Sequence, residues 1–261
     1  MLREAIRPQS PGPDSGRRLR VCPPGEDPVK WRIRVCGPLA LWGGVRTGPE
    51  CFSMLIPSAS AVEGKFRSVL GKKELRWVPT SVSLLRMPGS KEIMCNERKD
   101  LAHRHMQLRT QTNHVFLTDV DYILEAYVTV NHRLAGEDDT VAKFNSMMAR
   151  RIREGYRHYQ PYLGRREGTA YITEAGTEIV LSGTGEILIQ DAPEPKPIPL
   201  TLDLGFVFYG RDYDGEPEMG DNATHYLAPM KILNGVAKYP TWDEVRRFGK
   251  PYTAREARRF R

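Results

Sequence analysis

The sequence predicts an α+β protein with a ferredoxin-like, RRM-like N-terminal domain over residues 30–175 and a small β-rich C-terminal domain over residues 176–240. Patterns typical of strands and helices follow one another in the first part in the order β-α-β-β-α-β, which is the ferredoxin-like order. Strand patterns separated by turn residues then dominate. Residues 1–29 are rich in Pro, Gly and Arg, and residues 241–261 are basic, which predicts a tail at each end.

The first strand, helix and strand are expected between residues 31 and 87. Residues 31–36, WRIRVC, alternate apolar with polar side chains, as a half-buried strand does. Residues 57–70 predict a helix, because a Pro-Ser pair opens the segment and Gly71 closes it. Residues 75–87 predict a second strand, in which Pro79 is tolerated only at an edge or a bulge.

The second half of the predicted sandwich contains another strand and helix. Residues 121–130 place apolar side chains on one face of a strand. Asp139 or Thr140 can cap a helix that runs to Glu154, and Gly155 is positioned to end it. The apolar side chains of this helix recur at three- and four-residue steps, which predicts that they form its buried stripe: Val141, Phe144, Met148 and Ile152.

Shorter elements complete the pattern. Residues 169–173 predict a short strand. Residues 178–190, EIVLSGTGEILIQ, predict a hairpin around a Ser-Gly-Thr-Gly turn. The Pro-rich residues 191–199 predict a linker, and residues 204–209 a last apolar strand.

Several classes of protein are excluded by composition. No apolar run approaches the length of a membrane span, and the N-terminus lacks the apolar core of a secretory signal, so we expect a cytoplasmic protein without a membrane partner. The four cysteines and the pair His103 and His105 lack metal-ligand spacing, and the acidic run 212–221 has its glycine in the wrong place for a calcium loop. We therefore expect no metal and no cofactor.

The most informative segment is residues 143–167, KFNSMMARRIREGYRHYQPYLGRRE. It contains seven Lys or Arg residues and two Glu residues, an excess of +5 in a chain whose net charge is +7. Basic groups bind a phosphate backbone, aromatic rings stack on unpaired bases, and glycine permits close backbone approach. The segment therefore predicts RNA binding, although an isolated basic helix is more often simply a solvated face.

The predicted RNA-binding side chains are basic or aromatic and lie on the first strand, on the basic helix and on the loop that follows it: Arg32, Arg34, Arg150, Arg151, Arg153, Tyr156, Arg157, Tyr159, Arg165 and Arg166. His158 lies among them. Its imidazole is a candidate general acid or base, and contact with a base or phosphate is at least as good an interpretation.

Six short motifs, spread in order over about 70% of the chain, resemble those of the CRISPR-associated Cas-five family, subtype d, of type I-C complexes. They are FSMLIPSASAVEG from residue 52, RWV from residue 76, IMCNE from residue 93, TDVDYILEA from residue 118, GYRHYQPYLGRRE from residue 155 and DLGF from residue 203.

The resemblance implies an RNA-binding subunit of a Cascade surveillance complex. Its implied partners are the repeat RNA and the 5′ handle of the mature crRNA, a backbone subunit of the Cas-seven type and a large subunit of the Cas-eight type, with target DNA met indirectly. It also implies metal-independent endoribonuclease cleavage within the repeat, by attack of a ribose 2′-hydroxyl on the adjacent phosphate. That reaction needs a base, an acid and a cation.

The sequence departs from the family at two of its three catalytic positions. The resemblance implies a Tyr, a Lys and a His, and the aligned residues are Phe52, Lys143 and Phe144. Phenylalanine transfers no proton, and Phe144 falls on the buried stripe. Lys143 alone supplies charge without a titrating partner near neutral pH, a role that His158 or the tyrosines beside it would have to fill.

Three hypotheses follow. The first is a processing ribonuclease in which Lys143 neutralises phosphate charge while His158, or a tyrosine of the loop, transfers protons. The second is a non-catalytic clamp on the crRNA handle, with a separate processing nuclease. The third is a general RRM-like RNA-binding protein unrelated to CRISPR.

Overall fold

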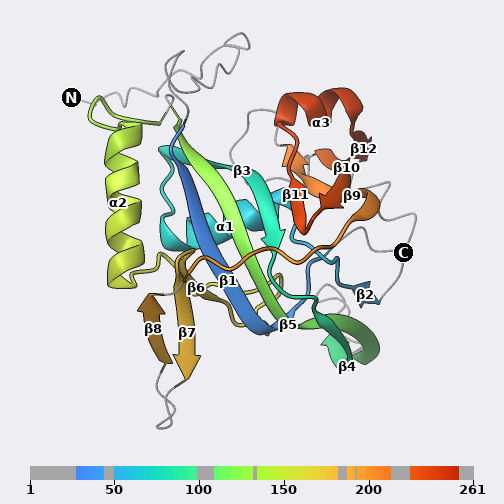
Figure 1. The fold of residues 1–261 in the computed structure, drawn as a ribbon. Coiled ribbons are helices and arrows are strands. Elements are labelled where there is room, and N and C mark those ends of the chain that lie inside the picture. The colour runs from blue at the N-terminus through green and yellow to red at the C-terminus, as the bar shows by residue number, and fades with distance from the viewer. Residues whose placement is uncertain are drawn as a thin grey trace, which may run out of the picture.

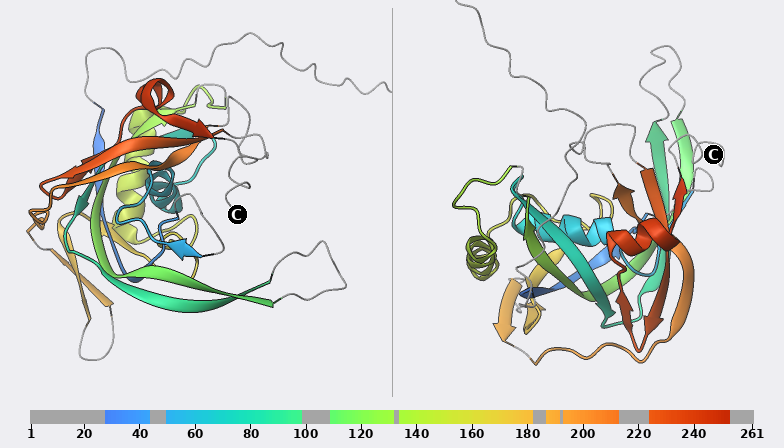
Figure 2. Two further views of the ribbon diagram at one scale, coloured as in Figure 1. Left: turned by 90° about the vertical axis from the view of Figure 1, so that its right-hand side faces the viewer. Right: turned by 90° about the horizontal axis from the view of Figure 1, so that it is seen from above.

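The computed structural model describes residues 28–43, 50–98, 109–131, 134–181, 187–191, 193–212 and 224–252. These residues form ten strands of one sheet, a separate two-stranded hairpin and three helices (Figures 1 and 2). The sheet-dominated architecture confirms the predicted α+β class. None of the described helices is long and apolar enough to cross a membrane.

The elements occur in the following order: β1 (Lys30–Ala40), β2 (Cys51–Phe52), α1 (Ala59–Val69), β3 (Leu75–Leu84), β4 (Gly89–Arg98), β5 (Arg109–Val130), α2 (Val141–Glu154), β6 (Tyr171–Glu174), β7 (Thr177–Leu181), β8 (Ile187–Asp191), β9 (Leu202–Asp212), β10 (Thr224–Leu233), β11 (Val236–Lys238), α3 (Trp242–Phe248) and β12 (Lys250–Tyr252).

The sheet runs in the order β12-β10-β11-β3-β5-β1-β6, while β2 and β4 pair with β5, and β9 pairs with β10. At its centre, β3, β5, β1 and β6 are antiparallel to their neighbours. Alternation along β1 directs Ile33 and Val35 into the core, where both are completely buried, and Arg32 and Arg34 to the opposite face. Helices α1 and α2 pack against the apolar face, as the shared hydrophobic cluster shows.

The two helices that the sequence predicts, α1 and α2, both begin at a capping side chain. The hydroxyl of Ser58 accepts from the N–H of Ala61 at the start of α1, and Leu70 is the C-cap. Thr140, one of the two expected caps, accepts from the N–H of Lys143 at the start of α2. Gly155 ends that helix with a left-handed φ of +73°, a conformation that glycine adopts at little cost.

Strand β5 extends well beyond the predicted residues 121–130. Its first half pairs with β4, which the sequence did not predict as a strand, and its second half with β1 and β3. The buried face of the first half carries Thr112, His114 and Phe116, so two of its three buried positions are polar and give no hydrophobic alternation. His114 is accommodated because its Nδ1 accepts from the N–H of Cys51 at 3.1 Å.

Pro79 lies at an irregularity of β3, as predicted. The register between β3 and β5 shifts between Pro79 and Ser81. A bulge at this point lets the ladder continue around a residue that has no N–H to donate.

The C-terminal strands join the same sheet through the pairing of β11 with β3. The hairpin β7–β8 forms as predicted, and β6 and β9 contain most of the expected strands 169–173 and 204–209. Strands β10 and β11 were not predicted. Buried residues of this part, such as Met230 and Tyr239, belong to the hydrophobic cluster that α1 and α2 cover. The division near residue 175 stays a prediction.

The expected C-terminal tail is wrong for residues 242–252, which form α3 and β12. A capping box starts α3, because Thr241 and Glu244 exchange hydrogen bonds. Val245 is buried in the hydrophobic cluster. Residues 1–27 and 253–261 of the two expected tails, and the pair His103 and His105, lie outside the described residues.

The predicted linker runs as a strap across the sheet face opposite α1 (Figures 1 and 2). The N–H of Ile198 donates to the carbonyl oxygen of Leu84 at 2.9 Å. Glu194 forms an ion pair with Arg32. The chain's own linker therefore occupies part of the face that carries Arg32 and Arg34.

Candidate nucleic-acid interface

Helix α2 has one apolar face and one cationic face. Phe144 and Met148 are completely buried, and Val141 and Ile152 pack against the same cluster, which confirms the predicted stripe. Lys143, Arg150 and Arg153 are exposed. Positions 143 and 150 are seven residues apart and therefore lie on one side of the helix.

The N-terminal end of this cationic face is organised around Asp139. Lys143 Nζ donates to Asp139 Oδ1 at 3.0 Å. The hydrogen bonds from Lys143 and from the N–H of Gly136 hold the pKa of Asp139 below its ordinary value, with a smaller contribution from the charge of Lys72. Lys72, exposed just after α1, therefore lies near the start of α2. We call Lys72, Lys143, Arg150 and Arg153 the cationic surface.

Arg150 and Arg151 are adjacent in the sequence, but their side chains contact different groups. Arg150 Nε lies 4.0 Å from Glu154 Oε2, in an exposed pair that screens only part of its charge. Arg151 Nη1 donates instead to the carbonyl oxygen of Val69 at 2.8 Å, at the C-terminal end of α1. Arg151 therefore joins the two helices, and its role in RNA binding stays a prediction.

The α2–β6 segment, residues 155–170, lies along α1. The N–H groups of His158 and Tyr159 donate to the carbonyl oxygen of Ser68, at 2.7 and 3.3 Å. The Tyr159 hydroxyl donates to the carbonyl oxygen of Gly64 at 2.7 Å. Further along, the N–H of Leu41 donates to the carbonyl oxygen of Leu163 at 2.9 Å. These bonds fix the segment against both α1 and the end of β1.

Gly164 is required where the α2–β6 segment meets the end of β1. Its φ is +83°, and a Cβ atom there would lie 1.9 Å from the carbonyl oxygen of Leu41. The glycine of the QPYLG motif therefore permits a close approach of two backbones.

We expect Gly164→Ala to lower the free energy of unfolding by at least about 2 kcal/mol, because it combines a left-handed φ with a backbone clash. Gly155→Ala is the matched control: Gly155 has a similar φ of +73° but nothing within 4 Å of the added Cβ atom, so a loss of about 1 kcal/mol is expected. Urea unfolding of both variants measures the difference, and equal losses would contradict the clash.

Aromatic side chains of the segment face solvent beside the cationic surface. Tyr156 is 62% exposed and Tyr159 is 40% exposed. The exposed His158 ring packs edge-on against Tyr159, with ring centroids 5.8 Å apart. The same ring lies against Gly71, where an added Cβ atom would be 2.6 Å from His158 Cδ2. Exposed rings on a fixed backbone are suited to stacking with unpaired bases.

The remaining predicted arginines differ in how they are held. Arg157 Nη2 donates to the carbonyl oxygen of Ile172 at 2.6 Å, and partial burial lowers the pKa of Arg157. Arg165 is half-buried, and Arg166 is exposed next to it.

Arg32 and Arg34 lie on the other face of the sheet and are paired with carboxylates. Arg34 donates two hydrogen bonds to Asp121, from Nε at 3.0 Å and from Nη2 at 2.7 Å. Arg32 contacts Glu125 as well as Glu194 of the linker. The structure therefore does not bring these two arginines together with α2, and their contact with RNA stays a prediction.

Phe52 and Phe144, which align with the Tyr and the His that the resemblance implies, differ in their exposure to solvent. Phe52 is an exposed residue of β2, with 61% of its surface accessible. Phe144 is completely buried among apolar side chains. Lys143 and His158, the two candidate catalytic residues, are both exposed. No group of His, Cys, Asp and Glu residues within the described ranges could hold a metal ion.

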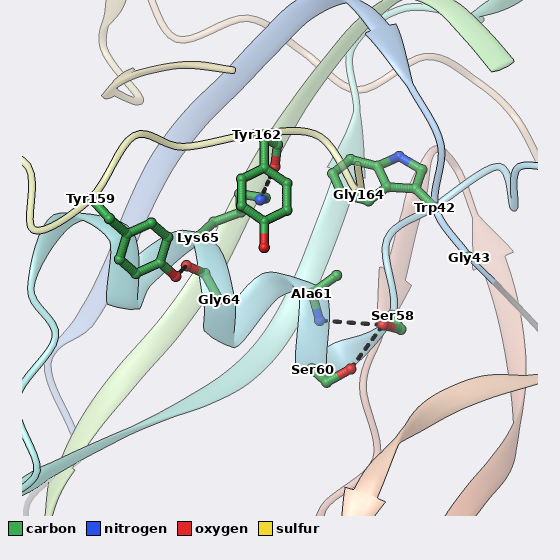
Figure 3. A pocket seen from close by; sticks show the side chains of 10 residues that line it. All are labelled: Trp42, Gly43, Ser58, Ser60, Ala61, Gly64, Lys65, Tyr159, Tyr162 and Gly164. Atoms are coloured by element: carbon green, nitrogen blue, oxygen red, sulfur yellow. Dashed lines mark hydrogen bonds between the residues drawn. The ribbon is translucent and has the colours of Figure 1, made fainter. Parts of the chain in front are cut away.

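A pocket of about 240 Å³ lies between the N-terminal half of α1, the α2–β6 segment and the end of β1 (Figure 3). Lys65 lines it with only 4% of its surface exposed. Its Nζ donates to the carbonyl oxygen of Tyr162 and lies 4.6 Å from the centroid of the Tyr162 ring and 5.8 Å from that of Trp42. Burial lowers the pKa of Lys65 from 10.5 to about 8.

Sequence reasoning did not single out Lys65, although a signal was present. The buried residues Val62, Phe66 and Val69 of α1 recur at helical spacing, and Lys65 falls within the same face. A lysine on a buried stripe is unusual enough to mark a site.

The chain is similar to known CRISPR-associated proteins. A family model described as CRISPR-associated protein (Cas_Cas5), for the Cas5d subtype, matches residues 32–240. A CRISPR pre-crRNA endoribonuclease Cas5d from Thermus thermophilus is 26% identical over 195 residues, which cover 73% of this chain and 78% of that protein.

Two solved structures share the fold. One is a CRISPR-associated protein, with a TM-score of 0.58 and 19% identity over 84% of this chain and 95% of that one. The other is a functionally uncharacterized protein from Streptococcus mutans, with a TM-score of 0.57 and 20% identity over 84% and 95%.

Proposed function

Because the chain belongs to the Cas5d family of CRISPR-associated proteins, as its motifs predicted, we propose that it binds the repeat-derived 5′ handle of crRNA in a Cascade surveillance complex. Its proposed partners there are the Cas-seven-type backbone and the Cas-eight-type large subunit, with target DNA reached through the complex. The proposed compartment is the cytoplasm.

The observation that carries this proposal is the arrangement of α2 and the α2–β6 segment. Exposed cations on α2 adjoin exposed aromatic side chains on a segment whose backbone is fixed against α1. Cations attract the phosphates of the handle, and the aromatic rings can stack on its unpaired bases. A rigid segment also loses little conformational entropy when RNA binds.

We further propose that β6-β1-β5-β3 with α1 and α2 is the ferredoxin-like, RRM-like sandwich of the family. The strand order and the antiparallel pairing support this assignment. Since the linker strap and carboxylate pairs occupy the outer face at Arg32 and Arg34, the helix side is the better candidate for the handle.

Cleavage of the precursor is the second candidate function, favoured by the Thermus thermophilus relative. The chemistry would depend on Lys143 for charge, with His158 or a neighbouring tyrosine for proton transfer. In the structure, Lys143 pairs with Asp139, and the neighbouring position 144 is a buried phenylalanine. These contacts favour a clamp with weak cleavage or none.

Incubation with cognate repeat RNA in EDTA tests the two functions. We expect tight binding with cleavage no more than weak, because the residue next to Lys143 is a buried phenylalanine that transfers no proton. Rapid cutting at one site that leaves a 2′,3′-cyclic phosphate, and that is lost in Lys143→Ala, would establish the ribonuclease instead. Weak binding that does not discriminate the repeat from unrelated RNA would contradict both functions.

A further inference from the structure

The pocket at Lys65 contains a buried positive charge that no carboxylate of the described residues neutralises. Among the described residues, neither an ion pair nor a carboxylate hydrogen bond involves Nζ, which contacts the Tyr162 carbonyl oxygen and two aromatic rings. Burying a lysine without a counter-charge is unfavourable, so such a site either neutralises the lysine or receives an anion.

The rest of the pocket is also suited to an anion. Ser58 and Ser60 line it at the start of α1, where their hydroxyls are 3.1 Å apart, Ser58 caps the N–H of Ala61, and the first turn contains no acidic residue. Helix N-termini carry a partial positive charge that favours phosphate groups. Gly43 and Gly64 also line the pocket, and a Cβ atom at either would meet nothing within 4 Å, so their backbone is open to a ligand (Figure 3).

The size and position of the pocket limit its ligand. A volume of about 240 Å³ is below the range of about 300–1,000 Å³ typical of small-molecule sites. It is lined by Tyr159, which belongs to the proposed RNA-binding segment (Figure 3). A single phosphate with part of its nucleotide fits these limits better than a larger cofactor.

We propose that this pocket binds one phosphodiester group of the crRNA handle, with Lys65 Nζ as its charged partner. This site deepens the proposed function and rests on it. Lys65 thereby joins the cations that hold the RNA, although it is not on α2 and none of the predicted RNA-binding residues except Tyr159 lines its pocket.

The first test compares RNA affinity in Lys65→Met with that of the unchanged protein. Methionine preserves most of the side-chain volume and removes the charge. We expect affinity for repeat RNA to fall about tenfold, with thermal unfolding still cooperative. Unchanged affinity in a folded variant would overturn the pocket while leaving RNA binding by α2 intact, so the two proposals fail separately.

The second test is first made on the unchanged protein and therefore holds even if Lys65→Met does not fold. Single methylphosphonate substitutions, which remove one phosphate charge at a time, are scanned along the handle. We expect one position to weaken binding by about tenfold. In Lys65→Met the same substitution should have no further effect. A scan of the unchanged protein in which no position weakens binding would overturn the proposal, and so would a position that stays equally sensitive in a folded Lys65→Met.

The pH dependence of binding provides a third readout. Apart from Lys65, the titratable groups that line the pocket are the phenols of Tyr159 and Tyr162. Burial lowers the pKa of Lys65 to about 8, so the free protein loses this charge as the pH rises through that value. RNA affinity should therefore fall between about pH 8 and pH 9.5 in the unchanged protein more steeply than in Lys65→Met. Parallel profiles would contradict the assignment.

Discussion

Replacing Lys143, Arg150 and Arg153 together with glutamine is expected to weaken binding of repeat RNA by at least about 30-fold near 0.1 M salt. All three side chains are exposed on α2, and the change lowers the net charge from +7 to +4, since each substitution removes one positive charge. Glutamine is a good helix former, so α2 should persist. Arg151 is left unchanged because its hydrogen bond to Val69 joins the two helices.

A matched control separates this local effect from the overall charge. Replacing Lys231, Lys238 and Arg247 with glutamine produces the same net charge of +4, and these three exposed residues lie in the C-terminal part of the chain. We expect a loss of affinity of no more than about threefold, because exposed charges further than a Debye length from the RNA are largely screened. Equal losses in the two triple variants, measured by fluorescence anisotropy, would show that only net charge matters.

Restoring the histidine of the family pattern by Phe144→His is expected to destabilise the protein by about 3 kcal/mol and not to create a ribonuclease. Phe144 is completely buried in the hydrophobic cluster, where an imidazole would replace apolar contacts and lack a partner. Phe144→Leu, which remains apolar, should cost about 1 kcal/mol and is the matched control.

The pH dependence of the Phe144→His variant gives a second check. Burial lowers the pKa of a histidine below that of the unfolded chain, so the unfolded state binds more protons at acidic pH. The free energy of unfolding should therefore fall further as the pH drops below about 6.5. A variant as stable as the unchanged protein, which cut repeat RNA in EDTA, would mean that position 144 reaches the substrate.

Local signals predicted those parts of the fold that depend on neighbouring residues. The caps of α2, Thr140 and Gly155, act within one turn, and the alternation of β1 needs only the next residue. The first half of β5 was missed because Thr112 and His114 occupy buried positions, and His114 is satisfied by a hydrogen bond from Cys51, 63 residues away. Such compensation has no local signature in the sequence.

In the candidate site, too, local composition was predictable from the sequence, whereas contacts between distant residues were not. The charge and aromatic content of residues 143–167 identified α2 and the segment after it, and both lie together in the structure. The pairing of Arg34 with Asp121 depends on the register between β1 and β5, which the sequence does not specify. Lys65 acquires its unusual environment only when Tyr162, almost 100 residues later, lies over it.

The measurement that tests the central claim most directly is the slope of log K against log salt concentration for repeat RNA. If α2 contacts the phosphates, replacing Lys143, Arg150 and Arg153 should reduce the magnitude of this slope by about 2, since each phosphate contact on a single strand contributes about 0.7. The C-terminal triple variant should retain the slope of the unchanged protein. A slope preserved in the α2 variant and reduced in the C-terminal one would place the RNA on another surface.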